Sequence, residues 1–249
     1  MNDIAIVIPI RLNSTRLPRK VLLDLAGKPI IQHVYERCLA VPYINYVIIA
    51  VDSIELYERC SQFCKNVVLT NTEHKSGTDR VAEAIEQFPS IKYIINVQGD
   101  EPFIHPSTIE KIAKELWKNK SSMVTSVCFI ENTSDLKNRS VVKVVFDTDN
   151  YALYFSRSAI PFSVHRDDSL TYYKHVGIYG YSREQLVQFV NWEQSYLEKV
   201  ESLEQLRALT NCVKIKIVLS EESLGIDTLE DYKKACKLFA GRLTNNEVF

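Results

Sequence analysis

The chain has 249 residues, which is long enough for one large domain or two small ones. With 46% hydrophobic and 24% charged residues it has the composition of an ordinary folded protein, which argues against a disordered, collagen-like or low-complexity chain. The formal net charge of -1 provides no overall positive field, so we expect no nonspecific binding of nucleic acid or anionic lipid.

No stretch of the sequence is typical of a membrane span or a secretion signal. The longest apolar runs, Ile4–Ile8 and Tyr46–Val51, are far shorter than the roughly 20 residues that cross a bilayer, and the start Met1-Asn2-Asp3 is not cationic. Cys60 and Cys64 could share a metal on one helix, but no second Cys or His pair completes a tetrahedral site, so we interpret them as packing residues. We therefore expect a cytoplasmic protein without membrane insertion.

Strand-like and helix-like segments alternate through the first half of the chain. The apolar runs IAIVI, YVIIAV and YIINV do not alternate with polar residues, which is typical of strands covered by helices on both faces. This order predicts an α/β fold with a parallel sheet. In chain order the predicted segments are a strand Ile4–Ile8, a helix from Pro29, a strand Tyr46–Val51, a helix near Ile54–Phe63, a strand Val67–Thr70, a helix from Thr78 to about Gln87, a strand Tyr93–Val97 and a helix from Pro106 through Trp117.

Beyond about Ser122 the pattern becomes richer in strands, with the runs MVTSVCFI, VVKVVFD and YALYFSR. We interpret residues 122–180 as an insertion onto the far edge of the sheet. A helix-rich segment, Ser182–Leu209, then leads to a strand Val213–Val218 and a closing helix from Thr228. No repeat, linker or Gly/Ser-rich tract divides the chain, so we predict a single domain, residues 1–249, with a subsidiary strand-rich lobe.

The loop after the first predicted strand is strongly basic. Ligands of open α/β sheets bind outside the carboxyl ends of the strands, and arginine suits phosphate oxygens, so the loop indicates an anion site, although a solvated basic loop is the alternative. No glycine occurs before Gly27, which excludes a Walker A loop and a G-x-G-x-x-G fingerprint. Arg and Lys side chains, rather than the backbone amides of a glycine-rich loop, would therefore supply most contacts to phosphate, which favours a triphosphate. The loop's cationic and hydroxyl residues are Arg11, Ser14, Thr15, Arg16, Arg19 and Lys20.

Acidic residues follow a later strand and recur near the C-terminus. Asp100 and Glu101 follow the predicted strand Tyr93–Val97, after Gln98 and Gly99. Asp227 precedes the closing helix. Carboxylates at such positions can hold a hard cation, whereas a turn or a helix cap is the ordinary alternative. Together with the basic loop they indicate metal-assisted phosphoryl or nucleotidyl transfer, and no Ser/His/Asp arrangement or zinc spacing competes.

Several sequence blocks occur together in one order: Ser14–Pro18 with Lys20, His74–Arg80, Asn96–Pro102 (NVQGDEP), Tyr151–Pro161 (YALYFSRSAIP), Lys174–Tyr181 (KHVGIYGY), Leu203–Leu209 (LEQLRAL) and Gly225–Thr228. In these blocks the sequence resembles the 3-deoxy-manno-octulosonate (Kdo) cytidylyltransferases, or CMP-Kdo synthetases, over essentially its whole length. The resemblance implies a three-layer nucleotidyltransferase-like α/β fold with a mostly parallel, Rossmann-like central sheet. It also implies a smaller strand-rich lobe that forms a homodimer.

The implied reaction is attack of the anomeric hydroxyl of Kdo on the α-phosphate of CTP with Mg²⁺, which gives CMP-Kdo and pyrophosphate for lipopolysaccharide or capsule synthesis. The resemblance assigns Arg11, Ser14, Arg16 and Lys20 to the triphosphate, Ser76, Gly77, Arg80, Gln98 and Gly99 to the cytidine, and Asp100 and Asp227 to Mg²⁺, with Lys20, Asp100, Asp227 and Arg16 catalytic.

For the sugar, the resemblance points to Arg157, His175, Tyr179, Glu204 and Gln205. The two-residue period of a strand places His175, Gly177 and Tyr179 on one face, and Arg157 would be a charge on an otherwise apolar face that could meet the sugar carboxylate. The alternatives are a structural histidine and a solvated helix surface at Glu204 and Gln205.

Two departures from the family pattern concern the basic loop and a histidine. Arg19 stands where the family usually has glycine and Val21 where it has a second proline, while Lys199-Val200-Glu201 replaces a His-Ile-Glu block. Three alternative functions stay open: the same reaction on the 8-amino analogue of Kdo, a relative that activates another acid sugar such as a sialic acid, and an inactive nucleotide-binding protein.

Overall fold

The computed structural model describes residues 3–164 and 170–244. The chain divides into two compact units. Unit 1 comprises Met1–Ile91, Asn96–Pro106 and Ser223–Phe249, and unit 2 comprises Lys92–Ile95 and Ser107–Glu222. Strand β6 (Tyr93–Val97) runs from one unit into the other.

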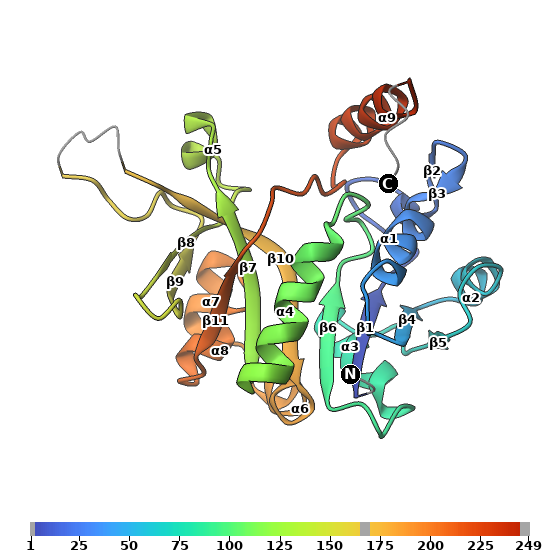
Figure 1. The fold of residues 1–249 in the computed structure, drawn as a ribbon, viewed down its shortest axis with the longest axis horizontal. Helices are drawn as coiled ribbons and strands as arrows, with labels where there is room; N and C mark the ends of the chain where they lie inside the picture. The colour runs from blue at the N-terminus through green and yellow to red at the C-terminus, as the bar shows by residue number, and fades with distance from the viewer. Residues whose placement is uncertain (1–2, 165–169, 245–249) are drawn as a thin grey trace. The chain divides into compact units, whose positions relative to one another are not determined.

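Unit 1 contains the predicted parallel strands. Strand β4 (Tyr46–Val51) pairs in parallel with β1 (Ile4–Pro9) on one side and with β5 (Val67–Leu69) on the other. Helices α1 (Ile30–Leu39), α2 (Ile54–Cys60) and α3 (Gly77–Glu86) contact these strands (Figure 1). Every residue of β1 is buried, as its uninterrupted apolar run predicts, because helices cover such strands. Three short elements, the 3₁₀ turn η1 (Lys20–Leu22), β2 (Asp24–Leu25) and β3 (Lys28–Pro29), and the longer helix α9 (Leu229–Thr244) complete the unit.

Unit 2 has a mixed sheet. Strand β7 (Met123–Phe129) pairs in parallel with β11 (Ile215–Leu219) and antiparallel with β10 (Tyr173–Ser182). Strand β8 (Lys143–Phe146) pairs antiparallel with β10 and with β9 (Ala152–Ser156). The predicted insertion, about 122–180, lies in this unit, apart from residues 165–169, which are outside the described residues.

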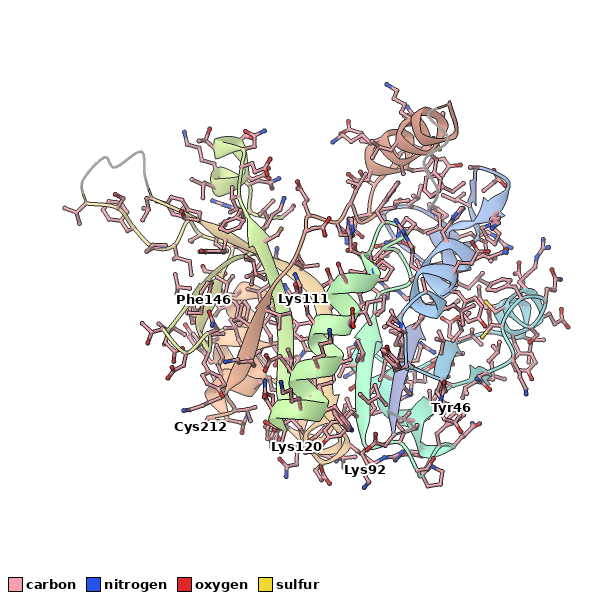
Figure 2. The ribbon with its side chains drawn as sticks, in the orientation of Figure 1. Tyr46, Lys92, Lys111, Lys120, Phe146 and Cys212 are labelled. Atoms are coloured by element: carbon pink, nitrogen blue, oxygen red, sulfur yellow. The ribbon has the colours of Figure 1, made fainter. Side chains whose placement is uncertain are left out.

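The helices of unit 2 are short except for the first. Lys111 on the first of them donates from Nζ to the backbone oxygen of Leu219 at 2.8 Å, which ties that helix to the end of β11 (Figure 2). The helix-rich segment predicted at Ser182–Leu209 divides into three separate helices. The helices are α4 (Pro106–Asn119), α5 (Thr133–Lys137), α6 (Arg183–Asn191), α7 (Tyr196–Glu201) and α8 (Leu206–Thr210).

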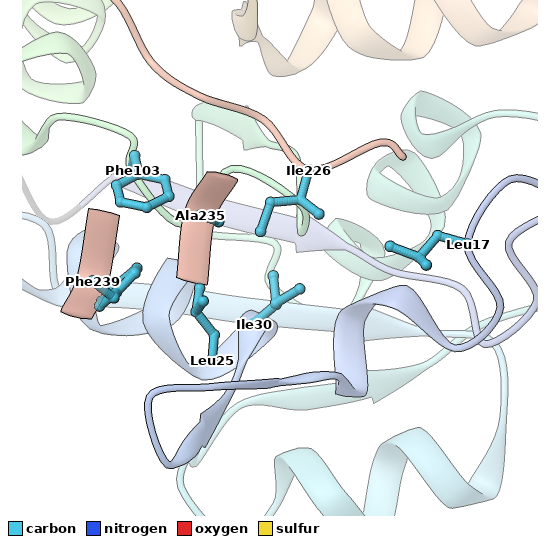
Figure 3. Packing of buried hydrophobic residues seen from close by; sticks show 7 residues of the cluster. All are labelled: Leu17, Leu25, Ile30, Phe103, Ile226, Ala235 and Phe239. Atoms are coloured by element: carbon cyan, nitrogen blue, oxygen red, sulfur yellow. The ribbon is translucent and has the colours of Figure 1, made fainter. Parts of the chain in front are cut away.

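A cluster of buried apolar side chains joins distant parts of unit 1 (Figure 3). Leu17 from the basic loop and Ile226 from the segment before α9 belong to the same cluster, so burial of both side chains fixes two chain segments against one core. The other members are Leu25, Ile30, Phe103, Ala235 and Phe239.

Helix α9 begins with a reciprocal cap that leaves the Asp227 side chain available. Asp231 accepts from the backbone N–H of Thr228 at 2.9 Å, and the N–H of Asp231 donates to the Thr228 hydroxyl at 3.2 Å. Capping of α9 is therefore supplied by Thr228 and Asp231 rather than by the carboxylate of Asp227.

Within residues 3–164 and 170–244, no helix is both long and apolar enough to cross a membrane.

Candidate active site

Unit 1 has a cavity of about 260 Å³ beyond the carboxyl ends of β1 and β6. All nine residues predicted for the nucleotide, and both predicted metal ligands, line it. Open α/β sheets bind ligands at this end of the strands. The lining residues are Pro9, Ile10, Arg11, Ser14, Thr15, Arg16, Lys20, Val21, His74, Lys75, Ser76, Gly77, Arg80, Gln98, Gly99, Asp100 and Asp227.

Backbone, apolar and ionic contacts hold the basic loop to the body of unit 1. The backbone N–H of Leu12 donates to Asp52 at 3.0 Å, the Leu17 side chain is buried in the core, and Arg19 forms an ion pair with Glu55 on α2. Arg19 has φ 55°, the left-handed conformation that suits glycine. Arg19 therefore keeps the backbone conformation that glycine would adopt here, and its side chain adds an ion pair with α2.

Lys20 joins the loop to both predicted metal ligands. Its ammonium forms ion pairs with Asp100 and, at 2.9 Å, with Asp227, and Arg16 contacts the second oxygen of Asp227 at 3.2 Å. Burial opposes the charge on Lys20, but the two carboxylates outweigh it and raise the pKa of this lysine above its usual value. The sequence separated these residues by up to 207 positions, and the fold brings them together.

Two glycines allow the backbone to form the cavity wall. A Cβ on Gly99 would lie 2.2 Å from the Ile10 side chain, and one on Gly77 would lie 3.3 Å from Pro9. Close packing against Ile10 therefore requires glycine at position 99. Ser76 caps α3, so the N-terminus of this helix, with its partial positive charge, also lines the cavity.

Arg80 and Gln98 are oriented by fixed polar partners. Arg80 is buried and donates to the Thr70 hydroxyl at 2.5 Å and to the Asn71 backbone oxygen at 3.3 Å, and burial lowers its pKa. Gln98 donates to Asn96 at 3.0 Å. Both side chains are therefore ordered before any ligand binds.

The basic character of the cavity exceeds the sequence-based prediction. Lys75 and His74 line it, as does Thr15, although none of them was assigned to the nucleotide. The signal was present in the block His74–Arg80, of which Ser76, Gly77 and Arg80 were assigned to the nucleotide. With Arg11, Arg16, Lys20 and Arg80, Lys75 makes five cationic side chains against the two aspartates, a balance that favours a polyanion.

Glu101 is a third carboxyl group near the two aspartates. Burial, and then the charge of Asp100, raise the pKa of Glu101 to about 7. Its Oε2 accepts a hydrogen bond from the Ser223 hydroxyl at 2.8 Å. The sequence offered Glu101 with Asp100 as an acidic pair that could hold a cation, and the family resemblance then assigned the metal to Asp100 and Asp227 alone.

Unit 2 contains the residues predicted for the sugar. Arg157, just after β9, donates to three backbone oxygens: from Nε to Glu201 at 2.7 Å, and from its two terminal nitrogens to Arg139 at 2.8 Å and Ser202 at 3.2 Å. These bonds fix the guanidinium and leave one N–H on each terminal nitrogen, the number that a bidentate carboxylate needs.

The apolar face expected around Arg157 is not continuous. Phe155 is buried but Leu153 is 61% exposed, although alternation places both on the same face of β9. The pairing of β9 with β8 shifts register between Val145 and Phe146, which interrupts the alternation of β9 at Leu153, while Ala152 stays buried. The prediction of a uniformly apolar face was wrong.

His175 and Tyr179 lie together on β10. Their ring centroids are 5.2 Å apart, and their partners on β7, Val127 and Thr125, share a face. A bulge between Val176 and Tyr179 interrupts the regular alternation that predicted this arrangement.

The hydrogen bonds of His175 define its tautomer. The Thr125 hydroxyl donates its single proton to the Ile178 oxygen at 2.7 Å, so it accepts from Nε2 of His175 at 2.9 Å. Nδ1 is left as an acceptor. Burial lowers the pKa of His175 to about 4, so the imidazole is neutral at pH 7.

Glu204 and Gln205 lie in the turn before α8 rather than on a solvated helix face. Gln205 is buried, and its Nε2 has no hydrogen-bond partner within the described part of the chain. Burial, the neighbouring Tyr181 and the charge of Glu204 raise the pKa of Tyr179 well above its usual value. The buried Nε2 donor of Gln205 could bind a hydroxyl group of a ligand, which fits a sugar.

The neutral state of His175 predicts a pH-dependent stability. Between pH 6.5 and pH 4 the unfolded chain takes up a proton at His175 that the folded chain does not, so stability falls as pH falls. We expect the free energy of unfolding to drop by about 2 kcal/mol more in the parent than in His175→Gln between pH 7.5 and pH 5. Urea denaturation at both pH values measures this, and parallel losses in both proteins would contradict it.

Comparison with known proteins identifies the family. The cytidylyltransferase family matches residues 5–215. A 3-deoxy-manno-octulosonate cytidylyltransferase of Francisella philomiragia is 45% identical, covering 96% of this chain and 99% of its own length. One from Thermodesulfovibrio yellowstonii is 44% identical, with coverages of 93% and 96%.

Solved structures agree. A CMP:2-keto-3-deoxy-manno-octonic acid synthetase complexed with CTP superposes with a TM-score of 0.92 at 37% identity, covering 97% of this chain and 100% of that one. A 4-diphosphocytidyl-2C-methyl-D-erythritol synthase of Anaerococcus prevotii, at 14% identity and a TM-score of 0.66, shares the fold. The resemblance inferred from the sequence blocks is confirmed, and the chain belongs to the 3-deoxy-manno-octulosonate cytidylyltransferases of the cytidylyltransferase family.

Proposed function

We propose that this protein transfers CMP from CTP to the anomeric hydroxyl of Kdo and releases pyrophosphate. The observation that carries the proposal is the basic cavity of unit 1, in which five cationic side chains face two carboxylates. The chain is also 45% identical to a relative named 3-deoxy-manno-octulosonate cytidylyltransferase. Such a reaction needs charge neutralisation and orientation more than covalent chemistry from side chains.

The nucleotide half of the reaction is assigned to unit 1. Arg11, Ser14, Arg16 and Lys20 bind the triphosphate, and Arg16 and Lys20 neutralise the charge that develops on the leaving pyrophosphate. Gln98 and its neighbours Gly99, Gly77, Ser76 and Arg80 frame the cytidine. Lys20 has to exchange its contacts with Asp100 and Asp227 for phosphate oxygens when CTP binds.

Asp100 and Asp227 fit a magnesium ion. Both carboxylates approach the same point, now facing the Lys20 ammonium, and Mg²⁺ commonly uses one or two carboxylates with substrate phosphates and water. In the described residues no three His, Cys, Asp or Glu side chains form a site by themselves, which fits an ion whose remaining ligands are substrate phosphates and water. When bound, Mg²⁺ would neutralise phosphate charge and lower the pKa of the attacking hydroxyl.

The sugar half of the reaction is assigned to Arg157, His175, Tyr179, Glu204 and Gln205. The two remaining N–H groups of Arg157 suit the sugar carboxylate, and Nδ1 of His175 and Nε2 of Gln205 suit hydroxyls. Exclusion of water around the buried side chains strengthens these hydrogen bonds.

Replacement of Arg157 by alanine should act on the sugar alone. We expect Arg157→Ala to raise the KM for the sugar about tenfold or more, through loss of a charge-assisted bond, with the KM for CTP unchanged. Steady-state kinetics with each substrate varied in turn measures this. A raised KM for CTP would mean that Arg157 serves the nucleotide.

Pyrophosphate release from CTP and Mg²⁺ with Kdo, its 8-amino analogue or a sialic acid tests the proposed function. We expect turnover with Kdo. A preference for the amino sugar would keep the mechanism and change the substrate, whereas CTP binding without turnover on any sugar would support an inactive nucleotide-binding protein.

The homodimer stays a prediction, as do the cytoplasmic location and the single-domain division. Several apolar side chains of unit 2 are exposed: Phe162 is 85%, Val164 80% and Leu153 61% exposed, which supports an interface on the strand-rich lobe. Sedimentation at micromolar concentration should give the mass of two chains. A monomer there would contradict the dimer.

A further inference from the structure

Glu101 belongs to one of the two chain segments that carry the proposed metal ligands, and its side chain contacts the other. It follows Asp100 in the loop after β6, and its Oε2 accepts from the Ser223 hydroxyl at 2.8 Å. A Cβ on Gly225 would lie 2.7 Å from Oε1 of Glu101 and 3.2 Å from its Cδ. The carboxylate of Glu101 therefore packs directly on the backbone two residues before Asp227.

The same two segments are also joined next to this contact, at Asp100, Ile226 and Asp227. The N–H of Ile226 donates to the Asp100 backbone oxygen at 2.8 Å, and the Ile226 side chain is fully buried in the core cluster of Figure 3. Lys20 then bonds to Asp100 and Asp227. Glu101 adds a side-chain hydrogen bond to Ser223 and a packing contact with Gly225.

A carboxyl group in this position is costly for the fold. It loses hydration and lies near the charges of Asp100 and Asp227. An apolar residue would avoid that cost but could not accept the Ser223 hydrogen bond or match the space beside Gly225.

We propose that Glu101 is a positioning residue, which sets the separation of Asp100 and Asp227 by holding Ser223 and Gly225 against the loop after β6. This inference rests on the proposed function, because it concerns the metal that CTP transfer uses. Glu101 acts through the two aspartates and touches no substrate.

The test measures Mn²⁺ binding to the protein with CTP, without sugar, by electron paramagnetic resonance, alongside steady-state turnover. Gly225→Ala pushes a methyl group against the Glu101 oxygen, and Ser223→Ala removes the hydrogen bond. We expect each to weaken Mn²⁺ binding about tenfold or more. Glu101→Gln keeps an accepting oxygen of the same size, and its Mn²⁺ affinity should stay within about twofold of the parent.

A double-mutant cycle makes the contact itself measurable. In a Glu101→Ala background the oxygen that Gly225→Ala would meet is absent, so the second substitution should weaken Mn²⁺ binding much less than it does alone. Additive losses would overturn the inference. Ser223→Ala keeps the test open if Gly225→Ala does not fold.

A matched control separates positioning from general stability. Ser53 caps α2 with its hydroxyl, so Ser53→Ala also removes one serine hydrogen bond in unit 1, away from the aspartates. Equal loss of Mn²⁺ affinity in Ser53→Ala would make Glu101 a merely structural residue. Absence of turnover in the parent, with the cycle still non-additive, would contradict the proposed function and leave the positioning intact.

Discussion

Asp100→Asn is expected to lower kcat about a hundredfold or more, with the fold intact. The amide keeps the shape of the side chain but loses the charge that holds the metal and pairs with Lys20. The chemical step loses charge stabilisation, whereas CTP still meets the arginines of the loop. The measurement is kcat at saturating CTP and sugar over a range of Mg²⁺ concentrations.

The matched control for Asp100→Asn is Glu58→Gln. It removes one carboxylate from the exposed surface of α2 in the same unit and should leave kcat unchanged. If Asp100→Asn keeps the kcat of the parent, Asp100 is not a metal ligand.

Lys20→Ala is expected to lower kcat/KM for CTP about a hundredfold to a thousandfold. The buried ammonium faces Asp100 and Asp227 and lies in the cavity that we assign to the triphosphate, so its loss removes a phosphate contact and the cation that pairs with Asp100. Initial rates at low CTP concentration measure this ratio.

Lys28→Ala provides the comparison for Lys20→Ala. Lys28 pairs with Glu36 at 2.8 Å on the surface of unit 1, and exposed pairs of this kind contribute little. We expect its kcat/KM to equal that of the parent. A comparable loss in Lys28→Ala, or none in Lys20→Ala, would show that Lys20 does not contact the triphosphate.

Local patterns in the sequence were sufficient for the strands and the family. Uninterrupted apolar runs predicted β1, β4 and β6 because covered parallel strands need apolar residues on both faces. Helix boundaries were within a few residues, since caps such as Ser76 act over one turn. The ordered blocks identified the family, because several short motifs in one order are far more specific than one.

Long-range contacts decided what these patterns left open. The sequence offered Asp227 equally as a helix cap and as a metal ligand, and only the fold shows Thr228 and Asp231 in the capping role while Asp227 meets Lys20. Period-two spacing could not show the bulge in β10, because register depends on the partner strand. The same limit explains the wrong prediction of an apolar face on β9.

The sequence by itself determined the α/β class, the basic loop, the acidic residues after β6 and the family, because each depends on residues close together in the chain. Tertiary structure alone decided which charges meet. The contact of Glu101 with Ser223 spans 122 positions, and no periodicity or motif encodes a distance between side chains so far apart. Packing of Leu17 and Ile226 into one core brings those segments together and so places the charges of the candidate site.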